Sequence, residues 1–241
     1  YKKRKLNRAF KYLHIVWKHN RLESYGEIKD ASIAAHIVGL IWSKESNNYK
    51  DAENALNDSI KLAKQINDTR GIAKAYHSLG NLLIKDKRRF AEAEEYYNKS
   101  LKLEYEEKHY YGIFQVYNSL GNLLSKSSSR FNDAINAYNK AKEFAQKSNN
   151  RRGLSIAYSG LGDLYSRNER QYEKAIECYK ESIRASNSPM NLGQVYYFLA
   201  RLNVKMNKVK EDYIITKDDL INDKYIVINR GKKTTFIIKA I

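Results

Sequence analysis

Cysteine and proline are almost absent from the chain. Among its 241 residues there is one cysteine, Cys178, and one proline, Pro189. A single cysteine excludes an internal disulfide and the zinc sites that are built from cysteine clusters, so we expect a reducing, cytoplasmic setting. The longest apolar run, Ile33 to Trp42, has ten residues, about half of the roughly 20 that a membrane helix needs. We therefore expect no membrane span.

Glycine is also scarce, but four of the 11 glycines are evenly spaced. Each lies 41 residues from the last, at Gly39, Gly80, Gly121 and Gly162. The same step relates one set of aromatic residues and one set of alanines: Tyr49, Phe90, Phe131 and Tyr172; Ala52, Ala93, Ala134 and Ala175. A period between about 20 and 50 residues indicates stacked supersecondary units. Function is then expected on the surface of the stack rather than in one catalytic cleft.

Each unit is predicted to be a pair of helices. In the clearest copy, apolar residues at three- and four-residue steps predict helices over Ile72–Lys85 and Phe90–Leu103, on either side of a polar break. Glycine inside a helix costs roughly 0.5 to 1 kcal/mol relative to alanine. Its recurrence at one place predicts a neighbouring helix that passes too close for a side chain. Aromatic residues such as Tyr97 and Tyr138 are expected to fill the core.

The motif of the unit resembles a known family. Tyr76-x2-Leu79-Gly80-x2-Leu83, followed by Ala93-x3-Tyr97, is similar to the tetratricopeptide pattern W-x2-L-G-x2-Y, A-x3-F. The period of 41 exceeds the usual 34 and the late proline is missing, as in the longer units of kinesin light chains and of bacterial sensor and regulator proteins. The resemblance implies an all-α fold, a right-handed α-solenoid of helix-turn-helix repeats.

Three parts are expected along the chain. Residues 1–22 form a leading unpaired helix whose apolar stripe packs on the next repeat, and residues 23–207 form the solenoid. Its repeats lie near 31–64, 71–105, 112–146, 153–186 and 191–213. Residues 208–241 form a tail with a short β-hairpin, because two alternating apolar segments flank a turn at Gly231. The chain begins with Tyr1 rather than methionine, so we expect it to be part of a larger multidomain chain.

A candidate binding site follows from the resemblance, because the first helix of each tetratricopeptide unit lines the inner surface. The corresponding residues are Lys44, His77, Asn81, Lys85, Asn118, Asn122, Lys126 and Arg167. Asparagine amides can bond the backbone of an extended peptide, and the cations can meet carboxylates or phosphates, as in the carboxylate clamp of some family members. A second interpretation stays open. A cation near the end of a helix is favoured by the helix dipole by roughly 0.3 to 1 kcal/mol.

No pattern of catalytic or metal-binding residues is found. Gly153-x-Ser155-x-Ala157 lacks the strand that a nucleophile elbow requires, and His36 and His77 share a register without a third ligand. We expect no enzyme, no cofactor and no metal. The resemblance implies a protein–protein interaction scaffold or regulatory module that binds an extended, acidic peptide or a helix in its concave groove.

Two alternatives to a scaffold remain. One is the tetratricopeptide sensor domain of a larger signalling or defence protein, fused to an effector or nucleotide-switch domain. The other is a nucleic-acid binder, which the net charge of +17 raises. It ranks third, because residues 1–22 and 201–241 carry most of that charge and the repeats are nearly balanced.

Overall fold

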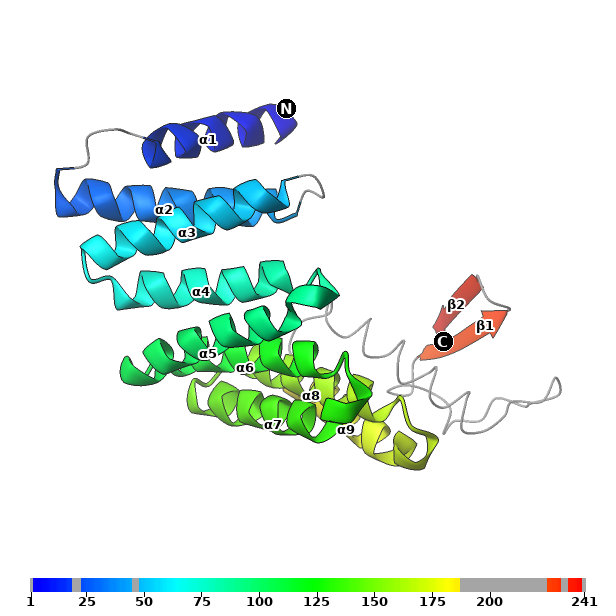
Figure 1. The fold of residues 1–241 in the computed structure, drawn as a ribbon. Coiled ribbons are helices and arrows are strands. Elements are labelled where there is room, and N and C mark those ends of the chain that lie inside the picture. Colours follow the sequence, from blue (N-terminus) through cyan, green and yellow to red (C-terminus); the bar gives the residue numbers. More distant parts are fainter. Residues whose placement is uncertain (1, 19–22, 45–47, 187–224, 231–233, 240–241) are drawn as a thin grey trace. The chain divides into compact units, whose positions relative to one another are not determined.

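The computed structural model describes residues 2–18, 23–44, 48–186, 225–230 and 234–239 (Figure 1). The repeats within these ranges are all-α. The helices are α1 (Lys2–Trp17), α2 (Tyr25–Trp42), α3 (Tyr49–Gln65), α4 (Thr69–Leu83), α5 (Phe90–Glu106), α6 (Tyr110–Leu124), α7 (Phe131–Lys147), α8 (Arg151–Tyr165) and α9 (Tyr172–Ala185). Short 3₁₀ turns, η1 (Lys87–Arg89), η2 (Ser128–Arg130) and η3 (Glu169–Gln171), precede α5, α7 and α9. The predicted repeat at 191–213 lies outside the described residues.

The chain divides into two compact units, residues 1–123 and 124–241, and each is described by itself. In the first unit α2 packs on α3, α4 packs on α5, and α3 also packs on α4 (Figure 1). In the second unit α7 packs on α8 and α8 on α9. No described helix has both the length and the apolar character needed to cross a membrane.

Capping residues set the helix boundaries. The first helix of the clearest repeat begins at Thr69, three residues before its predicted start, because Asp68 accepts a hydrogen bond from the Gly71 amide at 2.9 Å. Asn150 caps α8 in the same way through Gly153. Each of the second helices α3, α5 and α7 is followed by a residue with positive φ two positions after its last residue. These residues are Asn67, Lys108 and Asn149, which are again 41 residues apart. That left-handed position favours asparagine or glycine.

The predicted close approach at the repeated glycines is confirmed. A Cβ atom on Gly80 would lie 2.4 Å from the ring of Tyr97, and one on Gly162 would lie 2.6 Å from the ring of Tyr179. In each case the obstruction is a buried tyrosine side chain from the second helix of the same repeat. The predicted aromatic core therefore requires glycine at these positions, because a side chain there would meet a tyrosine ring.

The leading helix α1 packs on the first repeat, as predicted. Phe10, Leu13 and Val16 lie against a cluster that includes Trp17, Val38 and three alanines of α2 and α3. Trp17 Nε1 also donates a hydrogen bond to Asp58 Oδ2 at 3.2 Å.

Two strands are drawn in the tail, β1 (Tyr225–Arg230) and β2 (Thr234–Lys239), which pair antiparallel with Ile226 opposite Ile238. What this pair packs on stays a prediction.

Candidate peptide-binding surface on the first helices

Helices α2, α4 and α6 of the first unit lie side by side, and we call them the first-helix layer. His36 Nε2 hydrogen-bonds to Ser78 Oγ, and His77 Nε2 to Ser119 Oγ, both at 2.8 Å. Lys85 Nζ donates to the carbonyl of Ser43. All three contacts join residues 42 positions apart. Because the offset is constant, the helices run parallel and in register.

The two histidines of this layer are neutral at physiological pH. Burial and, as the smaller cause, the positive charge of Lys74 together lower the pKa of His36 to about 4. Burial likewise lowers the pKa of His77 to about 4. His77, one of the predicted binding residues, is half-buried and is hydrogen-bonded within the first-helix layer. It contributes packing and no charge.

The asparagines of the predicted site are partly used within the chain. Asn81 is exposed, but its Oδ1 accepts a hydrogen bond from the hydroxyl of Tyr97 at 2.8 Å. In the second unit Asp163 holds Tyr179 in the same way at 2.6 Å. One end of Asn81 therefore fixes the core tyrosine, which the sequence did not indicate.

Asn118 differs from the residues at the same place in other repeats. It is half-buried, and its Oδ1 has no hydrogen-bond partner in the structure. His36 and His77 each bond a serine 42 residues further on, whereas the residue at that distance from Asn118 is Gly160. Asn122, one turn later, is exposed.

The predicted cations lie at helix ends, and all four are exposed. Lys85 donates to the carbonyl of Ser43 at the C-terminus of α2 and lies 5.0 Å from the centre of the Tyr49 ring. Arg167 donates to the carbonyl of Ser125. These contacts fit the helix-end interpretation, but carbonyls and rings do not cancel a full charge. The two interpretations are therefore compatible.

Sequence reasoning missed further cations on the same helices. Lys29, Arg70 and Lys74 are exposed on α2 and α4, and Arg152 is exposed on α8. Lys29, Arg70 and Arg152 fit the step of 41 residues, with Tyr111 in the remaining place. That ladder was available from the sequence.

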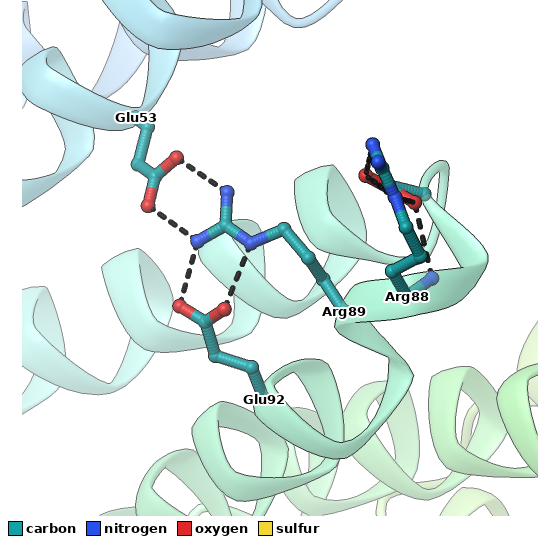
Figure 2. A network of polar contacts seen from close by, with 5 residues as sticks. Glu53, Arg88, Arg89 and Glu92 are labelled. Carbon is teal, nitrogen blue, oxygen red and sulfur yellow. Dashed lines mark hydrogen bonds and ion pairs between the residues drawn. The ribbon is translucent and has the colours of Figure 1, made fainter.

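Several cations near or on the second helices are paired with acids, whereas others, such as Lys61, Lys102 and Lys180, have no salt bridge within the described residues. Arg89 makes a bidentate contact with Glu53 at 2.7 Å and also binds Glu92 (Figure 2). Lys99 and Lys147 likewise pair with glutamates. Within the described residues, no salt bridge joins an acid to Lys29, Lys44, Arg70, Lys74 or Lys85.

Two other polar sites belong to the packing. Glu104 is only 3% exposed and accepts a hydrogen bond from His109 Nδ1 at 2.6 Å, while Arg70 contacts His109 Nε2 at 2.9 Å. A side chain on Gly112 would meet the Glu104 carboxylate. Cys178 is half-buried, and burial raises the pKa of its thiol to about 11, so little of it is the reactive thiolate at neutral pH.

Comparisons with known proteins agree with the helical repeat. A tetratricopeptide repeat model matches residues 71–147 and 112–188. The crystal structure of BtubC (BKLC) from P. vanneervenii superposes with a TM-score of 0.65, covering 89% of this chain and 94% of that one at 17% identity. Such low identity shows the fold alone, and helical repeats of this type are generally non-catalytic.

A tyrosine–tRNA ligase from Flavobacterium johnsoniae is 38% identical over 40 residues, which is 17% of this chain and 9% of the ligase. A match to so small a part of the ligase transfers no activity.

Proposed function

The chain is a tetratricopeptide-type repeat protein, and we propose that it is an interaction scaffold or regulatory module whose first helices bind an acidic partner, an extended peptide or a helix. Arrays of this kind generally present extended binding surfaces to other proteins. The observation that carries the proposal is the set of exposed cations on the first helices that have no acidic partner among the described residues.

The charge composition of α4 supports this assignment. Around α5, cations such as Arg89 and Lys99 are paired with acids, so they contribute to the array itself. Helix α4, in contrast, carries Arg70 and Lys74 and contains no acidic residue, so the charge of these two residues is available to carboxylates of a partner. The alternative, a sensor domain within a larger signalling or defence protein, uses the same surface and differs in what that surface controls.

Site-specific photo-crosslinking tests the surface directly. A benzoylphenylalanine at Tyr111 on α6 should capture the partner from a cell extract, while one at Lys102 on α5 should not. Both positions are exposed.

Charge reversal then tests the chemistry with the captured partner. The triple variant Lys85→Glu, Lys126→Glu, Arg167→Glu should weaken binding at least tenfold, about 1.4 kcal/mol. A control that reverses Lys61, Lys102 and Lys180, which are exposed on second helices, lowers the net charge equally. Equal loss in both variants, or no loss in either, would refute a specific role for the first helices. Circular dichroism checks that each variant stays helical.

A further inference from the structure

Helix α2 presents an apolar row to solvent. Ile33 is 46% exposed and Leu40 is 38% exposed, with half-buried Ile37 between them. These residues are spaced four and three apart, so they lie on one face of the helix. One repeat later, Lys74, Ser78 and Asn81 occupy the same places on α4. The apolar row of α2 therefore lies next to a polar and cationic row.

The cations cluster toward the two ends of this pair of helices. Because α2 and α4 are parallel and in register, Lys29 lies near Arg70 at one end, and Lys44 lies near Lys85 at the other. Lys74 on α4 lies close enough to α2 that its positive charge lowers the pKa of His36. Lys85 contacts the Ser43 carbonyl and the Tyr49 ring, Arg70 contacts His109 Nε2, and Lys29 lies over the Tyr25 ring, so none of these contacts is made to a carboxylate. The positive charge at both ends is left for a partner.

We propose that the α2–α4 face docks an amphipathic helix with an aliphatic stripe at its centre and carboxylates toward both ends. This inference rests on the proposed function and names the partner's chemistry. Charge complementarity requires the carboxylates, and Ile33, Ile37 and Leu40 require the aliphatic stripe.

A helix matches two neighbouring rows better than a strand does. Packed helices lie about 8 to 10 Å apart, and a helix with its side chains is about 10 to 12 Å wide. One helix therefore touches both rows at once. Successive side chains of a strand point in opposite directions, so a strand meets one row with alternate residues only. The stretch from Arg70 to Lys85 corresponds to about 22 Å of helix, so the docked segment is about four turns long.

Designed peptides test the proposal on the full chain. The probe is a labelled helical peptide with leucines at three- and four-residue steps in its centre and glutamates in its first and last turns. One control peptide has the same acids and leucines but two central prolines, and another has lysine in place of each glutamate. By fluorescence anisotropy, the helical acidic peptide should bind at least tenfold more tightly than either control.

Surface variants locate the binding. Leu40→Ser and Lys74→Glu should each weaken binding of the helical peptide at least fivefold. Ile156→Ser, which changes the residue matching Ile33 in the second unit, and Lys102→Glu on α5 should change it less than twofold. All of these positions are exposed, so the helical content should not change.

The outcomes separate this inference from the proposed function. Equal binding of the proline-containing acidic peptide overturns the helical partner, while acid binding by the first helices stands. Absence of binding by the helical peptide, or binding that is indifferent to Leu40→Ser and Lys74→Glu, also overturns the inference. If those two variants lose the peptide while the photo-crosslinked partner ignores the triple charge reversal, the α2–α4 face binds the acidic helix, and the proposed binding of the cellular partner through Lys85, Lys126 and Arg167 fails.

Discussion

Enlarging Gly80 tests how each repeat closes. A Cβ atom at this position would lie 2.4 Å from Cε1 of Tyr97 and 2.6 Å from Cδ1. Tyr97 is fully buried, and its hydroxyl donates to Asn81 Oδ1 at 2.8 Å, so the ring cannot move without losing that bond.

The expected change in the free energy of unfolding combines two destabilising effects with one stabilising effect. Overpacking costs about 1 to 3 kcal/mol, and loss of the tyrosine hydrogen bond adds about 1 kcal/mol. Replacing glycine inside a helix regains up to about 1 kcal/mol of helix propensity. We therefore expect Gly80→Leu to lower the free energy of unfolding by about 1 to 3 kcal/mol.

Urea unfolding followed by circular dichroism measures the effect. Gly26→Ala is the matched control, because nothing lies within 4 Å of a Cβ atom there, and it should leave the midpoint unchanged or raise it slightly. In a Tyr97→Ala background, Gly80→Leu should destabilise much less than in the wild type, since the ring that it meets is gone. A wild-type midpoint for Gly80→Leu would refute the argument that a buried ring closes over this glycine.

Three other changes have defined outcomes. Arg89→Ala should destabilise the array by about 1 to 2 kcal/mol, because it removes bidentate contacts to two glutamates. Its neighbour Arg88, whose side chain is 89% exposed, pairs with Asp86, so Arg88→Ala should leave the urea midpoint unchanged. His36 and His77 have a pKa of about 4 in the fold, against an ordinary value of 6.5 for histidine, so the unfolded chain binds more protons between these values and stability should fall as pH drops through that window. His77→Asn should flatten this pH dependence in urea titrations, and an unchanged profile would contradict it. Deleting residues 224–241 should lower thermal stability or solubility, since a lone hairpin is marginal in water; no loss, together with rapid amide exchange across both strands, would show that the tail packs on nothing.

The fold was predictable because small and aromatic residues recur at one fixed spacing along the chain. Glycines that meet a tyrosine ring, as Gly80 meets Tyr97, recur at one spacing, and that spacing defined the repeat. Helix boundaries were less accurate, because they depend on caps such as Asp68 and on left-handed residues such as Lys108, whose type varies from copy to copy.

The candidate site was only partly predictable. The sequence placed His77 and Asn81 on the first helix, but it did not reveal their bonds to Ser119 and Tyr97. Such bonds depend on the register between neighbouring helices, which a single unit does not encode. Arg70, in contrast, follows the same step of 41 residues and was recognisable from spacing alone.

The distribution of paired charge distinguishes stacking residues from residues available to a partner. Arg89 sits between two acids, and Arg130, one repeat later, binds Asp133 at 2.9 Å. At the next step of 41 residues the chain has Gln171, and the places of the acids are taken by Ile135 and Lys174. The cation is absent where its acids are absent, as expected if an unpaired charge between packed helices is costly. The exposed cations of the first helices do not follow this rule, because they persist without acids. Paired charge therefore identifies Arg89 and Arg130 as stacking residues, and the exposed cations of the first helices stay candidates for binding an acidic partner.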